Sequence, residues 1–565
     1  MGTRRFRRLA VVAAVGLVAA SCADDDDDDS GGGEGSGDLI SYDESAQCGS
    51  DEYAGNLAGL EAVDEHTVRI TLCEADPALP AKVAFATLAI HPSEHLADTD
   101  GEGSIVDAPI GTGPYMVEEG NWERGSQLVL TANPDYWDGA PSTPSVVFRW
   151  NEEAAQRLVA LQSGEVDGID NVGTEDYATI DGDGNLQLLP RDPLNIMYLG
   201  FNVDQAPFDN ETLRQAIGYA IDRERLIENF YPEGAAAATQ FQPPDMPGYE
   251  EGFEGYTYDP DRARQLLAEA GFPDGIDLGP LSYRNTPRPY VPQPVQIVSD
   301  IRDQLADVGI TVTPDEQESV ELIDNANAGN LGFHLLGWNA DFPDATNFWD
   351  YHFGPGGTLQ FGSGFDDIHD VLIEAAHGTD EDARNELYAE ANQLLMDHAP
   401  VIPVAWGSSA VAFQSDVEGA HASPLSNEQF SEMAVDRDQL VWMQNGEPGG
   451  LYCADETDGE ALRACEQINE SLLGYETGGV EPVAKLAEEW ESNEDLTEWT
   501  FTLREDVTFH DGSAFDANDV VESYRVQWDC GDERHVGREG TFSYWGSLFG
   551  GFLNADPESP VTCPA

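Results

Sequence analysis

The stretch "TFTLREDVTFHDGSAFDANDVV", residues 500–521, has the clearest local pattern in this chain. The apolar residues Trp499, Phe501 and Leu503 alternate with polar ones, so one face of this segment is apolar and the other polar. Successive side chains of a β-strand point to opposite faces, and this alternation therefore predicts a half-buried strand.

The second half of the same stretch predicts a turn and a helix. The turn "RED" is expected to return the chain into a second strand that holds Val507 and Phe509, which makes a hairpin. Asp516 is then expected to cap a helix, with Asp519 three positions later as in a capping box. These features establish local structure but no function.

Strand and helix patterns alternate along the rest of the chain. "HTVRITL", residues 66–72, reads as a strand, and Asp209 is placed to cap a long helix. Asp259 and Pro260 mark the start of another helix, and residues 380–397 carry a further helical pattern. The sequence therefore predicts an α/β protein.

The chain is strongly acidic, with 107 Asp and Glu against 26 Lys and Arg in 565 residues. A formal net charge of −81 argues against nucleic acid and anionic ligands as partners. The acids are spread along the whole chain, which favours a solvated, salt-tolerant surface over selection for cationic substrates.

The amino terminus has the pattern of an export signal, residues 1–22. Four arginines precede a short apolar run that ends in "AASC", which resembles a bacterial lipobox with Cys22 as the residue that is diacylated. Cleavage without lipidation is the alternative. Residues 23–38 are acidic and rich in Gly and Ser, as expected of an extended tether. We therefore expect a lipoprotein on the outer face of the cytoplasmic membrane.

Six cysteines follow Cys22, an even number that suggests disulfides in an exported protein. They could pair in about 15 ways. Spacing favours a bond between Cys453 and Cys465. No CxxC pair is present, which argues against a zinc ribbon or a redox site.

Taken together, these segments resemble the family 5 extracytoplasmic solute-binding proteins, the peptide- and nickel-type receptors of ABC importers. The segments that carry the resemblance are "TFTLREDVTFHDGSAFDANDVV", "GTGPY" (111–115), "NPDYW" (133–137), "ALQSGEVD" (160–167), "YLGFNV" and "APFDNETLRQAIGYAIDR" (198–223), "YDPDRARQLLAEAGFPDG" (258–275), "GWNADFPDATNFW" (337–349) and "APVIPV" (399–404). The resemblance implies a type II periplasmic-binding-protein fold of cluster C, with two lobes around a cleft and an extra peripheral domain.

The order of the segments departs from the family. The segment like residues 437–555 opens the family's proteins, but here it comes last. A truncated tandem duplication would repeat some segment, and none occurs twice. We therefore favour a circular permutation over a gene-assembly accident, with the family's natural ends joined through residues 418–439.

Transferred onto this order, the resemblance divides the chain into three domains. The peripheral domain is expected at 39–105 and 457–565, the first lobe at 106–193 and 405–456, and the second lobe at 194–404, with hinge strands near 193–200 and 401–406.

The resemblance also implies a mechanism and a ligand site. A receptor of this kind closes its lobes around a peptide or similar solute and delivers it to an ABC permease. Asp341 matches the aspartate that accepts a peptide's α-ammonium group, with Trp338 as an apolar wall and Asn339 beside them. The backbone after Glu447, up to Tyr452, is expected to pair with an extended ligand. A turn-capping role for Asp341 and a core role for Trp338 are the alternatives.

Other charged residues give weaker candidates. Arg284 and Arg288 could hold a ligand carboxylate, although solvated loop arginines explain them as well. His91 and His95 are four residues apart and His334 lies beside the "GW" motif, but the resemblance implies no metal role at the first pair. A nickel or metal-chelate ligand at His334 stays open, while no resident metal or cofactor is expected.

The sequence bears on two rival function classes. A secreted hydrolase is disfavoured because the chain has no GxSxG elbow and no HExxH motif, so we expect no enzyme. A surface receptor or chaperone could use the same cleft without transport. We expect a monomer whose partners are its ligand, permease subunits and a membrane surface.

Overall fold

The computed structural model describes residues 39–50, 53–118, 120–244, 246–354, 357–556 and 563. The expected signal, lipidation site and tether lie outside the described residues. Within the described part of the chain, no helix is both long and apolar enough to cross a membrane.

Residues from both ends of the described chain build one antiparallel sheet. Its strand order is β1-β2-β3-β21-β20. The strands are β1 (Ser41–Asp43), β2 (Leu57–Asp64), β3 (Thr67–Leu72), β20 (Ala487–Ser492) and β21 (Glu498–Leu503). In β21, Trp499, Phe501 and Leu503 are buried, as their alternation predicts. β21 pairs with β3, with Trp499 opposite Ile70, so the strand that begins the "TFTLREDVTFHDG" stretch packs beside residues 66–72 as expected.

The predicted hairpin through "RED" is wrong. β21 already pairs with β20 on one edge and β3 on the other, so neither edge is left for the returning segment. Residues around Val507 and Phe509 instead make one isolated bridge, Thr508 with Ala514. Both side chains are nevertheless buried, in the same hydrophobic core as the apolar residues of β3 and β21.

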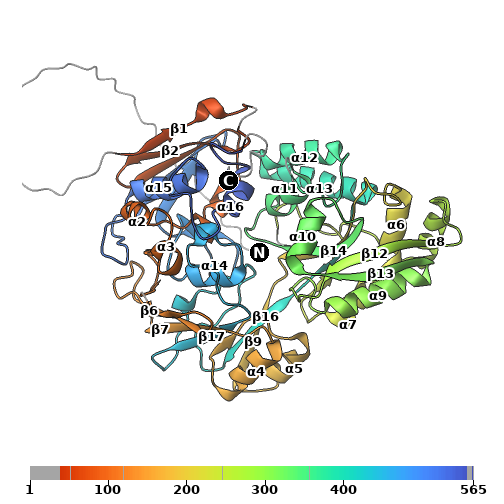
Figure 1. The fold of residues 1–565 in the computed structure, drawn as a ribbon, viewed down its shortest axis with the longest axis horizontal. Coiled ribbons are helices and arrows are strands. Elements are labelled where there is room, and N and C mark those ends of the chain that lie inside the picture. The colour runs from red at the N-terminus through yellow and green to blue at the C-terminus, as the bar shows by residue number, and fades with distance from the viewer. Residues whose placement is uncertain are drawn as a thin grey trace, which may run out of the picture. The chain divides into compact units, whose positions relative to one another are not determined.

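The predicted helix after this segment is α15 (Ala517–Trp528), and it begins with the expected capping box of Asp516 and Asp519. It packs on β2 and β3, and Figure 1 shows it next to β2, the late blue segment against the early red one. The helices of this region are α1 (Leu79–Lys82), α2 (Ser93–Thr99), α3 (Ser104–Asp107), α14 (Gly459–Cys465), α15 and α16 (Ser543–Phe549), with 3₁₀ turns Ser45–Gln47, Ala86–Leu88 and Cys453–Asp455. A two-stranded sheet, β18 (Leu473–Tyr475) with β19 (Pro482–Ala484), adjoins them.

A second sheet of eight strands combines residues 115–191 with residues 409–444. Its order is β4-β6-β7-β17-β8-β16-β9, with β5 paired to β6. The strands are β4 (Tyr115–Met116), β5 (Trp122–Glu123), β6 (Gln127–Ala132), β7 (Ser145–Trp150), β8 (Gly168–Ile169), β9 (Leu186–Arg191), β16 (Ser409–Gln414) and β17 (Leu440–Gln444). Its helices are α4 (Ala154–Ser163) and α5 (Tyr177–Asp181), with 3₁₀ turns Thr174–Asp176 and Phe430–Glu432.

A third sheet of six strands lies within residues 195–406, in the order β11-β15-β10-β14-β12-β13. The strands are β10 (Asn195–Phe201), β11 (Ala236–Ala237), β12 (Ile276–Arg284), β13 (Ile310–Gln317), β14 (Phe333–Asn339) and β15 (Val401–Trp406). The helices are α6 (Glu211–Ala220), α7 (Arg223–Phe230), α8 (Pro260–Glu269), α9 (Pro294–Asp307), α10 (Ser319–Asn327), α11 (Thr346–Phe353), α12 (Asp366–Ala376) and α13 (Glu381–His398).

Two helix starts in this third region test the capping predictions. Asp259 caps α8 with Pro260 at its first position, as predicted. The predicted cap of α6 is wrong by one residue, because Asn210, and not Asp209, accepts the hydrogen bond from the Leu213 amide. Both residue types cap helices well, so the sequence pattern alone does not choose between adjacent ones.

The chain passes twice between the second and third sheets, from β9 to β10 and from β15 to β16. One side chain ties these two connections together. The Asn195 Nδ2 donates to the Gly407 carbonyl at 2.7 Å, and the Gly407 amide donates to Asn195 Oδ1 at 2.8 Å. Asn195 is buried. The two crossings are therefore fastened to each other where they leave the sheets.

Four buried charges join segments from distant parts of the sequence. Arg191 contacts both Asp170, at 2.8 Å, and Glu428. Arg463 contacts the same two acids at 3.1 and 3.0 Å. All four side chains are at most 3% exposed. Burial alone would raise the pKa of Glu428, but the two guanidinium groups hold it below its ordinary value.

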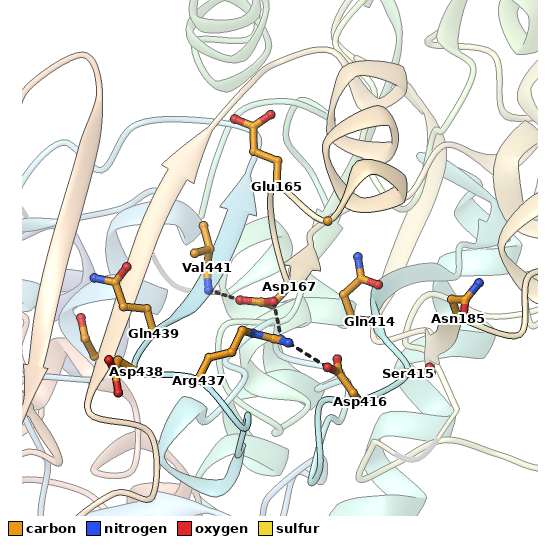
Figure 2. A pocket seen from close by; sticks show the side chains of 12 residues that line it. Glu165, Asp167, Asn185, Gln414, Ser415, Asp416, Arg437, Asp438, Gln439 and Val441 are labelled. Atoms are coloured by element: carbon orange, nitrogen blue, oxygen red, sulfur yellow. Dashed lines mark hydrogen bonds and ion pairs between the residues drawn. The ribbon is translucent and has the colours of Figure 1, made fainter.

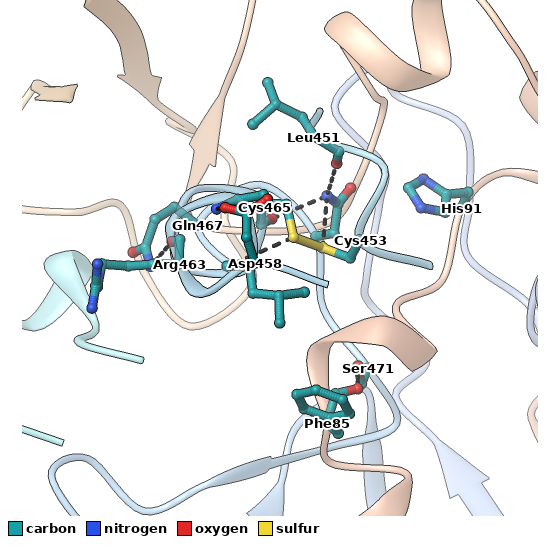
Figure 3. Close-up of a disulfide and its surroundings, with 12 residues drawn as sticks. Phe85, His91, Leu451, Cys453, Asp458, Arg463, Cys465, Gln467 and Ser471 are labelled. Atoms are coloured by element: carbon teal, nitrogen blue, oxygen red, sulfur yellow. Dashed lines mark hydrogen bonds between the residues drawn. A yellow bond between two sulfur atoms is a disulfide. The ribbon is translucent and has the colours of Figure 1, made fainter. Parts of the chain in front are cut away.

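Three disulfides use the six cysteines that follow Cys22. They join Cys48 to Cys73, Cys453 to Cys465 and Cys530 to Cys563. The middle bond confirms the pairing that spacing favours. Figure 3 shows it beside Leu451, where the Asn469 side chain contacts both the bond and the Leu451 carbonyl.

Candidate functional site

Asp341 lies two residues beyond the end of β14, in the loop that leads into α11. Two neutral groups donate to its carboxylate: the Tyr544 hydroxyl at 2.8 Å to Oδ1 and the Asn347 Nδ2 at 3.1 Å to Oδ2. Burial raises the pKa of Asp341 to about 6, while these two hydrogen bonds lower it. Among the described residues no Lys, Arg or His forms an ion pair with it. The half-buried carboxylate is therefore held by neutral donors and not by a cation.

Asn347 holds the neighbouring groups in place. Its Oδ1 accepts from the Asp341 amide at 3.0 Å and from the Trp338 indole at 3.1 Å. The Trp338 ring stacks on Tyr351, with ring centroids 4.2 Å apart. Trp338 is half-buried, and Asn339 is exposed. The three predicted residues of the "GWNAD" motif thus lie together, supported by Asn347.

The sequence reasoning missed Tyr544 and Asn347. Asn347 could have been found, because it lies in the same quoted motif, six residues after Asp341. Tyr544 lies on α16, 203 residues away in sequence, and no local pattern connects it to Asp341.

Glu447 and Tyr452 lie elsewhere. The Glu447 carboxylate accepts from the Gly125 amide at 3.0 Å. Tyr452 is 1% exposed and packs in the core against His91. The segment between them forms no strand, and the Leu451 amide donates to the Val106 carbonyl. In this structure that amide is thus already paired within the protein.

The two candidate arginines also have local partners. Arg284 donates to Ser319 Oγ at 2.7 Å and to the Tyr290 hydroxyl. Arg288 donates to the carbonyl of its neighbour Pro287. Within the described ranges neither guanidinium contacts Asp341, so the structure does not bring them to that carboxylate.

The histidines singled out in the sequence form no metal group among the described residues. His91 is buried, and burial lowers its pKa to about 4. His334 is fully buried on β14 and its ring lies against Phe361 and Tyr198. The described cluster with metal-ligand spacing is Cys530, His535 and Cys563, and its two sulfurs are bonded to each other.

A cavity of about 860 Å³ lies at one end of the eight-stranded sheet, and none of the predicted ligand residues lines it. Arg437, a basic residue of the cavity wall, already has two acidic partners. It pairs with Asp167 at 2.6 Å and with Asp416 at 2.7 Å. Figure 2 shows Arg437 between these two carboxylates. The cavity is an open acidic hollow, separate from the "GWNAD" loop.

Comparison with known proteins identifies the family to which the chain is similar. The family model described as bacterial extracellular solute-binding proteins, family 5, matches residues 31–360 and 481–536. Heme-binding protein A of Haemophilus influenzae is 31% identical over 387 residues, which cover 67% of this chain and 70% of the relative. The dipeptide-binding protein of Escherichia coli is 29% identical over 391 residues, which cover 67% of this chain and 72% of that protein.

Solved structures agree with this assignment. HbpA2 from Haemophilus parasuis superposes with a TM-score of 0.59 at 26% identity, over 68% of this chain and 76% of that one. The dipeptide-binding protein from Pseudoalteromonas sp. SM9913 in complex with Met-Leu gives a TM-score of 0.60 at 25% identity, over 70% and 77% of the two chains. The three sheets described above thus have the α/β fold of type II periplasmic binding proteins, and the chain belongs to the bacterial extracellular solute-binding proteins of family 5.

Proposed function

We propose that this protein captures a peptide, or a similar small solute with a free amino group, and that Asp341 binds the amino group. The observation that carries the proposal is the half-buried Asp341 carboxylate, which accepts hydrogen bonds from two neutral donors and forms no ion pair with a cation among the described residues. A desolvated carboxylate gains most from a charge-assisted hydrogen bond with an ammonium group. Relatives named as di- and tripeptide-binding proteins support this ligand class.

Asp341 also lies where two parts of the structure meet. It follows a strand of the six-stranded sheet, whereas its partner Tyr544 belongs to α16 near the end of the described chain. A ligand ammonium inserted between them would contact both parts at once. Contacts to both sides are what allows a ligand to shift such a receptor toward its closed form.

The proposal can be tested by ligand binding in solution. The purified protein should be screened by native mass spectrometry for a co-purifying ligand, and short peptides should be measured by calorimetry. Asp341→Ala is expected to weaken binding of a free peptide by roughly 10- to 100-fold, the value of one charge-assisted hydrogen bond.

Two controls make this test specific. Asp324→Asn removes an exposed carboxylate of α10 and should leave affinity unchanged. Acetylation of the peptide's amino group removes the charge from the ligand side and should weaken wild-type binding to the level of the Asp341 variant. Equal affinity of wild type and Asp341→Ala for the free peptide would exclude the assigned role.

We further propose that Cys22 carries the lipid anchor and that the receptor delivers its ligand to an ABC permease at the outer face of the cytoplasmic membrane. The lipobox-like sequence and the family's extracellular role support this. Intact-mass measurement of membrane-extracted protein should show a diacylated Cys22. A soluble product from wild type and from Cys22→Ala alike would argue against the anchor.

The order of the chain is proposed to be a circular permutation with the domain boundaries given above. The pairing of β21 with β3 supports it, as does the match of the family model in two separate blocks. A reordered chain, with residues 437–565 placed before 39–436, is expected to fold and to bind the same ligand. An insoluble reordered chain, produced beside a soluble wild type, would contradict the permutation.

A further inference from the structure

Phe342, the residue after Asp341, is buried in a core that belongs to another part of the chain. Its side chain is 3% exposed and packs in the same hydrophobic core as the apolar residues of β3, β21 and α15. The other described buried residues of that core come from 53–106 and 452–553, whereas Phe342 follows β14 of the six-stranded sheet. One aromatic ring therefore reaches from the loop after β14 into the core of the five-stranded sheet.

The loop that carries Phe342 is held firmly to the six-stranded sheet and its helices. Before Phe342, the Ala340 amide donates to the Leu194 carbonyl at 2.9 Å, next to the start of β10. After it, Asp344 pairs with Arg384 of α13 at 3.2 Å, and both of these side chains are at most 7% exposed. Because the loop is fixed on both sides of Phe342, a movement of the six-stranded sheet also moves this ring.

Two further contacts join the same parts of the chain. The Nδ1 of His377, at the end of α12, donates to the Ala75 carbonyl at 2.7 Å, a short distance after β3. The Tyr544 hydroxyl donates to Asp341, and the Tyr544 ring packs edge-on against Phe85 with centroids 4.9 Å apart. These contacts and the buried Phe342 ring lie on one side of the Asp341 loop, between the five- and six-stranded sheets.

The joining contacts are noncovalent, and a hinge movement would break them. Along the chain, residues of the eight-stranded sheet separate those of the five- and six-stranded sheets on both sides. The six-stranded sheet is therefore tethered through the two crossings described above. Opening at those crossings would pull the ring of Phe342 out of its core and expose it to water, which costs free energy.

We propose that Phe342 is a latch that holds the receptor closed before a ligand arrives. The inference rests on the proposed function, because the latch controls closure around Asp341. The ring is buried without any ligand, and the same burial is available when a ligand is bound. It therefore stabilises the empty and the filled closed forms alike, so the latch sets how often the receptor opens and not how tightly it holds the solute.

Small-angle X-ray scattering tests the latch on dialysed, ligand-free protein. The wild type is expected to be closed, and Phe342→Ala should have a larger radius of gyration. His377→Ala removes one hydrogen bond and should shift the radius in the same direction by less. Phe208→Ala is the control, because Phe208 is buried in a core made within the six-stranded sheet and its helices, and its radius should equal that of the wild type.

Binding kinetics with trialanine separate a latch from a ligand-binding residue. Since a ligand enters and leaves through the open form, Phe342→Ala should raise the association and dissociation rate constants together, each by about 10- to 100-fold. The affinity should then change by less than about threefold. Asp341→Ala, by contrast, is expected to lower the affinity. Stopped-flow fluorescence measures both rate constants.

The outcomes for the latch and for the proposed function can be told apart. An equal radius of gyration in the wild type, Phe342→Ala and His377→Ala would overturn the latch and leave the proposed function intact. Faster dissociation with unchanged association would also overturn it, since the ring would then stabilise the filled form alone. A wild type that binds no trialanine counts against the proposed function, while scattering still decides the latch. Thermal melting checks folding, and His377→Ala carries the scattering test if Phe342→Ala does not fold.

Discussion

At the scale of single residues, Asp341 in the "GWNAD" loop has surroundings unlike those of an ordinary surface acid. Asn347 aligns both the carboxylate and the Trp338 indole, and Tyr544 supplies a hydroxyl from a distant helix. Because both donors are neutral, they offset part of the cost of burial without neutralising the charge.

The raised pKa of Asp341, about 6, makes a prediction for the ligand-free protein. The folded state holds this proton more tightly than the unfolded state, so the stability that it contributes is complete below about pH 4 and is lost as the pH rises through about 6. As the pH rises from about 4 to about 6, the free energy of unfolding of the wild type should therefore fall by roughly 2–3 kcal/mol relative to that of Asp341→Asn. Urea unfolding at the two pH values measures this difference. Asp324→Asn should show no such gain, and pH profiles that run parallel for wild type and Asp341→Asn would contradict the assignment.

At the scale of elements, the segment 418–439 is held by charges as well as by packing. Glu428 meets Arg191 from β9 and Arg463 from α14, and both guanidinium groups also contact Asp170. The cluster therefore ties the segment to strands and helices that come before and after it in the sequence.

Removing one charge from this cluster is expected to be costly. Glu428→Gln leaves two buried guanidinium groups with a single carboxylate between them, and we expect a loss of about 3–5 kcal/mol in the free energy of unfolding. Glu432→Gln, an exposed acid four residues away, should change it by less than about 0.5 kcal/mol. A small loss in both variants would show that the cluster contributes little.

The link between the two crossing connections makes a second prediction at this scale. Asn195→Ala leaves the buried Gly407 amide and carbonyl without their partners, so we expect a loss of about 2 kcal/mol. Hydrogen exchange of the Gly407 amide should become faster in the variant. Asn330→Ala, at an exposed asparagine, is the matched control, and unchanged exchange at Gly407 would refute the role of Asn195.

The sequence predicted elements well where periodicity and caps agreed, as in β21, α8 and α15. It failed where tertiary pairing decided the outcome. The returning segment after "RED" had a strand-like pattern, but no free edge of β21 remained for it. For the site, the linear motif placed Trp338, Asn339 and Asp341 together, whereas the Tyr544 contact joins distant segments and no local pattern encodes it.

At the scale of the whole molecule, the net charge of −81 sets the response to salt. Like charges on a folded chain repel one another, and salt screens this repulsion. We expect the melting temperature to rise as salt increases from about 0.1 M to about 1 M at neutral pH. The rise should shrink near pH 4, where many carboxylates are protonated, and a melting temperature that is insensitive to salt at neutral pH would argue against a salt-adapted surface.

The sheet that joins the two ends of the described chain also affects the order in which its strands can pair during synthesis. The Ile40 amide donates a hydrogen bond to the side chain of Asn518, which is made 478 residues later. β3 likewise cannot pair with β21 until a similar length of chain has been synthesised. At ordinary rates of synthesis, about 5–20 residues per second, this interval is on the order of half a minute to more than a minute. Throughout it, β3 presents an unpaired edge with the apolar side chains of Val68 and Ile70. The first strands to emerge are thus completed late, and the open edge of β3 needs protection from premature pairing during this interval.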